Sequence, residues 1–289
     1  MPKVNGNQRL LMEWKGGHID FSLKTFIMGI LNVTPDSFSD GGKFCDTGRA
    51  VERALIMQEE GADIIDIGGE SSRPGAKPVS ADVELSRVMP VLKAIVKKTK
   101  VIVSIDTIKA IVAEEALSEG AEMVNDISAL RGDPKMAPLV AKQEVPVVLM
   151  HMRGTAPQNM QANTHYLNLI SEVIEFLQER IGFAHASGIG LSRIIIDPGI
   201  GFGKSIEKDN FTILKHLEKF KSLGKPILVG PSRKAFLGHL LNLPVNDREE
   251  ATAATVAVAV MNGANIVRVH DIKKIKRVVQ VVDAIKAAE

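Results

Sequence analysis

Polar and charged side chains follow each of eight short apolar segments in this sequence of 289 residues. In chain order, the residues at these ends are Asn32; Asp66; Asp106; Asn125 and Asp126; Met150 and His151; Asp197; Ser232, Arg233 and Lys234; and Arg268, His270 and Asp271. A single Asp in such a place is usually a capping residue or a hydrogen-bonded core residue. Eight polar ends are harder to satisfy separately, because buried polar groups without partners are strongly unfavourable. The pattern therefore predicts that the eight ends share one polar ligand.

The residue types narrow the chemistry of that ligand. Carboxylates supply hydrogen-bond acceptors, and an amide supplies both a donor and an acceptor. The groups of this kind are Asp66, Asp106, Asp197 and Asn125. Apolar side chains would wall the same pocket, namely Met150, Phe202 and Ile127. Acceptors around a flat apolar pocket suit a heteroaromatic ring with a guanidine-like edge.

A second group of side chains at the segment ends is basic and consists of Arg73, Lys234, Arg268 and His270. Ser232 is placed to be the N-cap of the next helix, so that backbone N–H groups of this helix would face the ligand. Basic side chains beside a helix N-terminus form an anion site, most often for phosphate. The residues alone therefore predict a ligand with a ring at one end and a phosphate group at the other.

The eight apolar segments are predicted to be β-strands that alternate with helices. The strands cover residues 25–31, 63–68, 101–105, 122–127, 145–150, 193–197, 226–230 and 264–269. Apolar residues at a 3.6-residue period predict helices over 82–98, 164–187 and Ile272–Ile285, and Asp133-Pro134 predicts the start of another. Alternating strands and helices form parallel sheets, and eight units favour a closed (β/α)₈ TIM barrel over an open doubly wound sheet. In such a barrel all eight polar ends meet at one mouth.

Residues 10–22 precede the first barrel unit and hold Gly16-Gly17 between two short segments of alternating apolar residues. They predict a β-hairpin that closes the bottom of the barrel. We therefore expect the chain, 1–289, to be one domain, with the barrel over residues 25–289.

Composition excludes several function classes. The net charge is only +2, from 36 basic and 34 acidic residues, so no nucleic-acid or membrane surface is expected. The basic run 273–277 is expected to be the solvated face of the last helix. The single Cys45 and the absence of a signal-peptide pattern lead us to expect a cytoplasmic protein. The longest apolar stretch, 251–261, is too short to span a membrane and predicts a closely packed helix, against a second subunit.

Two further patterns are not expected to form sites of their own. GIGFGKS at 199–205 resembles a nucleotide loop, but Pro198 stands where a Walker loop needs glycine. His151 and His270 have no second His or Cys at ligand spacing, which argues against structural zinc. A Mg²⁺ ion carried in by phosphate oxygens is compatible with the sequence.

Seven motifs occur in order along the chain: MGILNVTPDSFSDGG, IIDIGGESSRPGA, SIDT, VNDIS, DPGIGFGK, GPSRK and RVHD. Together they resemble the dihydropteroate synthases of the folate pathway, over nearly the whole barrel from Phe26 to Asp271. The resemblance implies a (β/α)₈ barrel, usually homodimeric, that condenses 6-hydroxymethyl-7,8-dihydropterin diphosphate with p-aminobenzoate. Diphosphate would leave with the assistance of Mg²⁺.

The resemblance also implies a role for each matched residue. Hydrogen bonds to the pterin would come from Asp106, Asn125, Asp197 and Lys234, with Arg268 over the pterin face and Asp66, Met150 and Phe202 completing the pocket. Diphosphate would be held by Asn32, Arg73, Arg268 and His270, and Asn32 would also reach Mg²⁺. The p-aminobenzoate site would be framed by Phe38, Ser72, Pro74, Ser232 and Lys234. Many family members have Thr where this chain has Ser72, which keeps the hydroxyl and loses a methyl group.

Phe38 is a large apolar ring among turn-forming residues just past the first strand. The resemblance implies that it covers p-aminobenzoate, on a loop that becomes ordered with ligand, and excludes water from a reactive cation. Asp36 and Asp40 would lie near the reacting carbon or the amine, and Asp106 would stabilise the cation formed when diphosphate departs first. Catalysis is expected to depend on Asp106, Asn32, Lys234, Arg268, His270 and Asp40.

Three other hypotheses compete with this one. A pterin-binding methyltransferase barrel would share the Asp and Asn ring but has no need of the diphosphate-binding set. A Schiff-base aldolase would use Lys234, whose pKa Arg233 could lower. A pterin-binding protein without activity would keep the pocket alone. Release of diphosphate, with and without p-aminobenzoate, discriminates among them.

Overall fold

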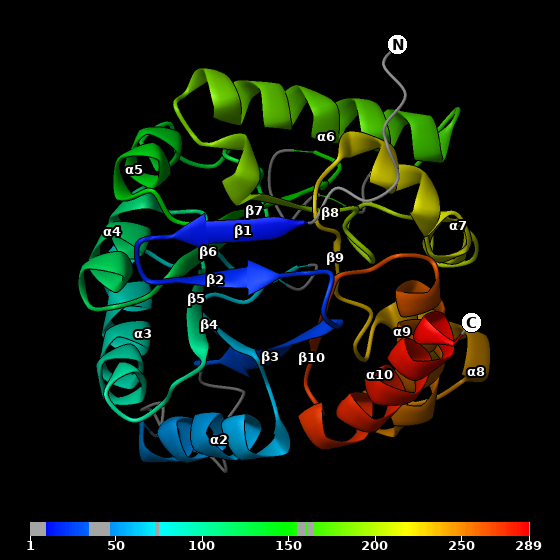
Figure 1. The fold of residues 1–289 in the computed structure, drawn as a ribbon, viewed down its shortest axis with the longest axis horizontal. Helices are drawn as coiled ribbons and strands as arrows, with labels where there is room; N and C mark the ends of the chain where they lie inside the picture. Colours follow the sequence, from blue (N-terminus) through cyan, green and yellow to red (C-terminus); the bar gives the residue numbers. More distant parts are fainter. Residues whose placement is uncertain (1–9, 35–46, 73–74, 155–159, 161–163, 289) are drawn as a thin grey trace.

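The computed structural model describes residues 10–34, 47–72, 75–154, 160 and 164–288. Eight parallel strands form one sheet in the order β8-β7-β6-β5-β4-β3-β10-β9 (Figure 1). Their bounds are β3 (Phe26–Asn32), β4 (Ile64–Gly68), β5 (Ile102–Asp106), β6 (Met123–Asp126), β7 (Val147–Met150), β8 (Ile194–Asp197), β9 (Leu228–Val229) and β10 (Ile266–Val269). A parallel bridge between Ile196 and Ile227 joins the two ends of this sheet, so the sheet closes into the predicted barrel.

Helices follow the strands and surround the barrel (Figure 1). They are α2 (Thr47–Glu60), α3 (Ala81–Val96), α4 (Ala110–Ser118), α5 (Met136–Gln143), α6 (Leu169–Ala186), α7 (Asp209–Lys215), α8 (Ala235–Leu241), α9 (Glu249–Met261) and α10 (Ile272–Ala287). In the described part of the chain, 3₁₀ helices lie in the connections: η2 (Leu191–Arg193), η3 (Leu217–Leu223) and η4 (Val245–Asp247). Among the described residues, none of these helices combines the length and hydropathy of a membrane span.

The helical periodicity predicted from the sequence is largely confirmed, with errors at the ends. In α10 the predicted apolar face is buried down to Val282, but Ile285, in the last turn of the helix, is 57% exposed. The helix expected to start at Asp133 begins at Met136 instead. One Asp133 carboxylate oxygen accepts the N–H of Lys135 at 2.9 Å, in the turn just before this helix, and the other accepts the N–H of Ala110 at 2.9 Å, at the start of the neighbouring helix α4.

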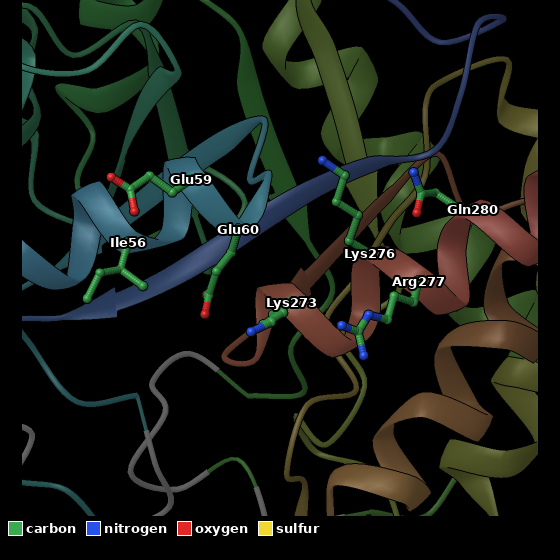
Figure 2. Close-up of a pocket in the computed structure, with 7 residues that line it drawn as sticks. All are labelled: Ile56, Glu59, Glu60, Lys273, Lys276, Arg277 and Gln280. Atoms are coloured by element: carbon green, nitrogen blue, oxygen red, sulfur yellow. The ribbon is translucent and has the colours of Figure 1, made fainter.

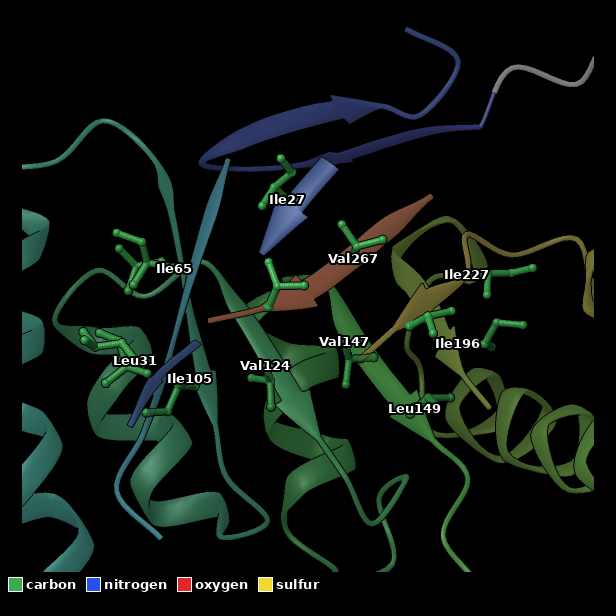
Figure 3. Close-up of a cluster of buried hydrophobic side chains, with 14 of the residues drawn as sticks. Ile27, Leu31, Ile65, Ile105, Val124, Val147, Leu149, Ile196, Ile227 and Val267 are labelled. Atoms are coloured by element: carbon green, nitrogen blue, oxygen red, sulfur yellow. The ribbon is translucent and has the colours of Figure 1, made fainter. Parts of the chain in front are cut away.

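Side-chain alternation along the strands separates two apolar layers. Every second residue points outward and packs against the helices, as Ile65 does in β4 (Figure 3). Ile67, two residues further along β4, belongs to the same outer apolar cluster. Ile64 points inward and belongs to a layer at the bottom of the barrel. Asp66 lies between the outward pair, so it points inward one layer above Ile64. The period of two therefore places a polar side chain inside the barrel directly above an apolar floor.

The N-terminal hairpin closes the bottom of the barrel, as the sequence predicted. Strands β1 (Leu11–Trp14) and β2 (Gly17–Asp20) pair antiparallel and lie across the barrel end (Figure 1). Met12, Ile19 and Phe21 are buried and pack on the inward-facing residues at the strand starts. The Trp14 indole N–H donates to a carboxylate oxygen of Glu122 at 3.2 Å, which ties the hairpin to the start of β6.

Candidate active site

Arg268 forms the centre of the polar layer inside the barrel. Its Nε donates to Oδ2 of Asp66 at 2.6 Å, and its Nη2 donates to Oδ2 of Asp106 at 2.7 Å. Asn125 also donates from Nδ2 to Oδ2 of Asp66, at 2.8 Å. The Asp66 side chain is fully buried, and its second oxygen has no hydrogen-bond partner in the described structure. Four residues from β4, β5, β6 and β10 thus meet in one network, as expected for polar strand ends of a barrel.

Burial dominates the ionisation of this layer. It raises the pKa of Asp106 to about 7, and although Arg268 lowers this pKa, Asp66 raises it further. Burial likewise raises the pKa of Asp197 to about 6. A hydrogen bond from the Gly199 N–H at 2.7 Å and the charge of Lys234 lower this pKa, but by less than burial raises it. Two carboxylates at the mouth therefore titrate near neutral pH, which is typical of groups that change charge in function.

Lys234 stands beside the apolar wall that the sequence predicted. Its ammonium lies 4.1 Å from the centre of the Phe202 ring, which is a cation–π contact. Burial and then Arg268 lower the pKa of Lys234 to about 8. Phe202 packs with Ile127 and Met150 in a small buried cluster, so the expected apolar wall is present.

Ser232 does not cap a helix, which corrects the sequence prediction. The N-cap position of α8 is Lys234, without a side-chain capping bond, because Arg233 has a left-handed backbone (φ 56°) that delays the helix start. The Ser232 hydroxyl instead lies 2.9 Å from Nδ1 of His270 and accepts the His270 backbone N–H at 3.3 Å. The start of α8 therefore has no side-chain cap, and the Ser232 hydroxyl orients His270 instead.

Other residues of the site lie around the same mouth. Asn32 ends β3 and is half-buried. Ser72, with Ser71, lines a small cavity together with Asp106, Thr107 and Ile127. Phe38, Asp36, Asp40, Arg73 and Pro74 lie outside the described residues, so their assigned roles stay predictions.

Comparison with known proteins identifies the family. The sequence model of the pterin binding enzymes matches residues 28–270. A dihydropteroate synthase from Bacillus subtilis (strain 168) is 46% identical over 279 residues, which are 96% of this chain and 95% of the relative. The chain belongs to the dihydropteroate synthase family of pterin binding enzymes.

Solved structures of this family share the fold closely. A Yersinia pestis dihydropteroate synthase with a sulfonamide drug complex superposes with a TM-score of 0.91 at 42% identity, over 96% of this chain and all of that one. A Xanthomonas albilineans dihydropteroate synthase with 4-aminobenzoic acid superposes with a TM-score of 0.90, also at 42% identity, over 98% of this chain and all of that one.

Some polar strand ends do not reach the dihydropteroate synthase site. Asp126 is fully buried and accepts the backbone N–H groups of Ser128 and Leu130, so it stabilises the turn after β6. Asp271 caps α10 by accepting the N–H of Lys274 at 3.1 Å. The guanidinium of Arg233 turns away to Glu249, at 3.1 Å. These three residues have the structural role that any single strand-end Asp or Arg most often has.

His151 and the lysine of GIGFGKS form an internal pair. Nζ of Lys204 lies 2.8 Å from Nδ1 of His151 and also donates to the carbonyls of Gly199 and Phe202, at 3.0 and 2.9 Å. Both side chains are buried, and burial lowers the pKa of Lys204 to about 7. The Lys204 ammonium is therefore engaged within its own loop, and the expectation that GIGFGKS forms no nucleotide loop stays a prediction. Lys204 itself carried no sequence signal beyond that misleading motif.

A larger groove, of about 470 Å³, lies outside the barrel between α2 and α10 (Figure 2). Its walls carry Glu59 and Glu60 from α2 and Lys273, Lys276 and Arg277 from α10. Most of these side chains are exposed, so the basic run is a solvated helix face as predicted. Charge here is mixed and screened by water, which distinguishes the groove from the buried site at the mouth.

Proposed function

We propose that this chain condenses 6-hydroxymethyl-7,8-dihydropterin diphosphate with p-aminobenzoate to give 7,8-dihydropteroate and diphosphate. The observation that carries the proposal is the buried network of Arg268, Asp66, Asp106 and Asn125 at the mouth of a dihydropteroate synthase barrel. The 4-aminobenzoic acid bound by the Xanthomonas albilineans relative supports the identity of the second substrate.

The pterin would occupy the pocket between the carboxylates and the apolar wall. Asp197, Asn125 and Asp106 offer acceptors and a donor toward the polar edge of the ring, while Phe202 and Met150 pack on its flat surface. One oxygen of Asp197 already accepts the Gly199 N–H, so the other is the one to accept from the ring. Arg268 would exchange part of its pairing with Asp66 and Asp106 for contact with the pterin and its diphosphate.

The diphosphate would leave toward the basic side of the mouth, held by Arg268, His270, Asn32 and Arg73. Ser232 fixes the orientation of the His270 ring for this task. If the diphosphate leaves before the amine attacks, the exocyclic carbon becomes a cation, and an ionised Asp106 stabilises it electrostatically. The amine then forms the new C–N bond and loses a proton, and no covalent enzyme intermediate is needed.

Mg²⁺ is proposed as the cofactor, carried by the diphosphate. Among the described residues, no three His, Cys, Asp or Glu side chains gather into a metal cluster. Asn32 offers an amide oxygen at the mouth, and a single hard oxygen ligand fits an ion that takes its remaining ligands from phosphate and water. When bound, Mg²⁺ neutralises charge on the leaving diphosphate. Chelation by EDTA should therefore abolish diphosphate release, and Mg²⁺ should restore it.

We also propose that the protein works as a homodimer in the cytoplasm. Helices α8 and α9 expose large apolar side chains, among them Leu240, Leu241, Val258 and Met261, each at least 46% exposed. A second copy would bury this surface. Sedimentation equilibrium of the wild type and of Val258→Glu tests the proposal: a dimer that Val258→Glu dissociates supports it, and a monomeric wild type contradicts it.

A diphosphate-release assay tests the function. The purified protein is incubated with Mg²⁺ and pterin diphosphate, with and without p-aminobenzoate, and the product is identified by mass spectrometry. We expect diphosphate and 7,8-dihydropteroate in equal amounts, only when p-aminobenzoate is present. No release with both substrates, or trapping of Lys234 by borohydride with a carbonyl substrate, would contradict the proposal.

A further inference from the structure

The loop that follows β4 is held tightly against helix α3. Gly69 packs so closely that a Cβ atom there would lie 2.7 Å from Cγ1 of Val88 and 3.0 Å from Cγ of Glu84. The carbonyl of Gly69 accepts a hydrogen bond from Nη1 of Arg87 at 2.7 Å. The beginning of this loop is therefore fixed by α3, two residues before Ser71 and three before Ser72.

Lys109 adds a third attachment from a different element. It lies just before α4, three residues after Asp106, and its ammonium bridges the carboxylates of Glu84 and Glu70. The distance to Glu84 is 2.6 Å, and the Glu84 side chain is only 1% exposed. Although burial lowers the pKa of Lys109, hydrogen bonds to Glu70 and Glu84 outweigh it and raise this pKa, so Lys109 stays charged. A charged ammonium therefore links this loop to α3 at neutral pH.

The position of Glu70 shows what this bridge controls. Glu70 directly precedes Ser71 and Ser72, and all three line the small cavity next to Asp106, together with Glu84. Lys109 thus connects the loop segment that contains Ser71 and Ser72 with the turn that follows Asp106. A pair needed only to join α3 and α4 would require Glu84 and Lys109 alone. The additional link to Glu70 acts on the loop.

We propose that Lys109 is a positioning residue for the arylamine substrate. By joining Glu70 to Glu84, it sets the distance between the Ser71–Ser72 segment and Asp106, and so shapes the subsite for p-aminobenzoate. The inference rests on the proposed function and deepens it. It assigns to Lys109, Glu70 and Glu84 a role in binding the second substrate, without contact with the reacting atoms.

Two variants test the bridge from its two sides. Glu70→Gln weakens the link to the loop and keeps the buried pair of Lys109 and Glu84. Lys109→Met combined with Glu84→Gln removes the bridge and leaves no buried charge of that pair unpaired. Lys109→Arg keeps the charge and serves as the conservative variant. Glu119→Gln is the matched control, because its exposed pair with Lys93, at 2.9 Å, also joins α3 to the end of α4.

The expected result is a separation of kinetic constants. The KM for p-aminobenzoate should rise about fivefold in Glu70→Gln and tenfold or more in the double variant, while kcat and the KM for pterin diphosphate stay within about twofold. Lys109→Arg should lie closer to the wild type, and Glu119→Gln should match it. A KM for p-aminobenzoate within about twofold of wild type in Glu70→Gln would overturn the proposal, and so would a common fall of kcat with a rise of both KM values.

Failure of the proposed function can be told apart from failure of this inference. If the wild type releases no diphosphate with both substrates, the reaction is wrong. Calorimetric titration of p-aminobenzoate into the wild type and Glu70→Gln, in buffer with Mg²⁺ and inorganic diphosphate, then decides the role of Lys109. Weaker binding by Glu70→Gln than by the wild type supports that role. Equal binding by the two proteins, or no binding by the wild type, contradicts it. If the double variant does not fold, Glu70→Gln alone gives the answer.

Discussion

The two ends of the barrel are built from the same eight strands but have opposite contents. At the bottom, inward-facing residues such as Met28, Ile64 and Ile266 are apolar, and the hairpin residues Met12 and Ile19 cover them. One layer higher the inward-facing residues are charged or polar, with Arg268 paired to two carboxylates. The position of a residue along its strand therefore decides whether it stabilises the fold, at the bottom, or is available to bind a ligand, at the top.

The energetics of the two ends differ accordingly. Each large apolar side chain buried at the bottom contributes about 1.5–3 kcal/mol to folding. A buried ion pair contributes little net stability, because desolvation offsets the attraction between the charges. The charged layer is therefore not explained by stability. Its cost is understandable if the same groups bind a polar ligand.

The largest effect is expected from breaking the top layer at its centre. Arg268→Met leaves Asp66 and Asp106 without their cation, and removes a group proposed to contact both pterin and diphosphate. We expect kcat/KM to fall about 1,000-fold and the free energy of unfolding to fall by about 3 kcal/mol. Steady-state kinetics and urea denaturation measure the two effects. Arg193→Met, which removes an exposed pair with Glu144, is the control. Near-normal activity of Arg268→Met would show that Arg268 has a structural role and does not take part in binding or catalysis.

A substitution at the bottom end of the barrel should lower stability and leave activity unchanged. Ile19 is 1% exposed in the hairpin, so Ile19→Ala opens a cavity against the barrel floor and should lower the free energy of unfolding by about 3 kcal/mol. Activity at 25 °C should not change, because the floor does not touch substrate. Leu11→Ala in the same hairpin, at a side chain 40% exposed, should cost less than about 0.5 kcal/mol. A lower kcat/KM of Ile19→Ala, under conditions where the variant is fully folded, would contradict the proposed separation of a stabilising bottom end from a substrate-binding top end.

Much of this division could be predicted from the sequence. The alternation of eight apolar segments with helices predicted the barrel, and the polar residues at the strand ends predicted which layer is charged. The hairpin position followed from the apolar alternation around Gly16-Gly17. These features depend on local pattern, which a single sequence carries.

The remaining features depend on long-range contacts, which the pattern does not carry. Nothing near Lys109 in the sequence indicates Glu84, which comes from another helix. The left-handed backbone of Arg233 moved the start of α8 and turned Ser232 toward His270, although the local sequence suggested an N-cap. Asp133 holds the turn before its own helix through one carboxylate oxygen and the start of α4 through the other, and only the first of these contacts is local in the sequence.

A smaller effect should come from the edge of the top layer. Asp197→Asn replaces one carboxylate oxygen with a donor and weakens the acceptor for the pterin edge. The dissociation constant for pterin should rise about tenfold, which corresponds to one hydrogen bond to a charged group. Calorimetric titration with a pterin measures it, and Asp82→Asn on the exposed side of α3 is the control. An unchanged affinity for pterin would mean that the pterin ring does not bind next to Asp197.

The pH dependence of kcat/KM tests the ionisation of the same layer. Asp106, with its pKa raised to about 7, must be ionised to stabilise the cation, so activity should rise as pH increases through 7. Lys234 loses its proton above its pKa of about 8, so activity should fall again at higher pH. Between pH 7.5 and pH 6.5 we expect a fall of about threefold. A profile that is flat over this range would show that Asp106 does not titrate during binding or catalysis.

The smallest change concerns the rim of the top end, where Ser72 stands half-buried in the cavity beside Asp106. Ser72→Thr keeps the hydroxyl and adds the methyl group that many family members have. Partial burial of one methyl group against p-aminobenzoate should lower its KM about twofold and leave kcat unchanged. Ser222→Thr, at an exposed position of η3, controls for the substitution itself. An unchanged KM would mean that p-aminobenzoate binds too far from Ser72 to contact the added methyl group. A large increase in KM would mean that the loop containing Ser72 leaves no room for this methyl group. Either result would measure how closely the top end is fitted to its second substrate.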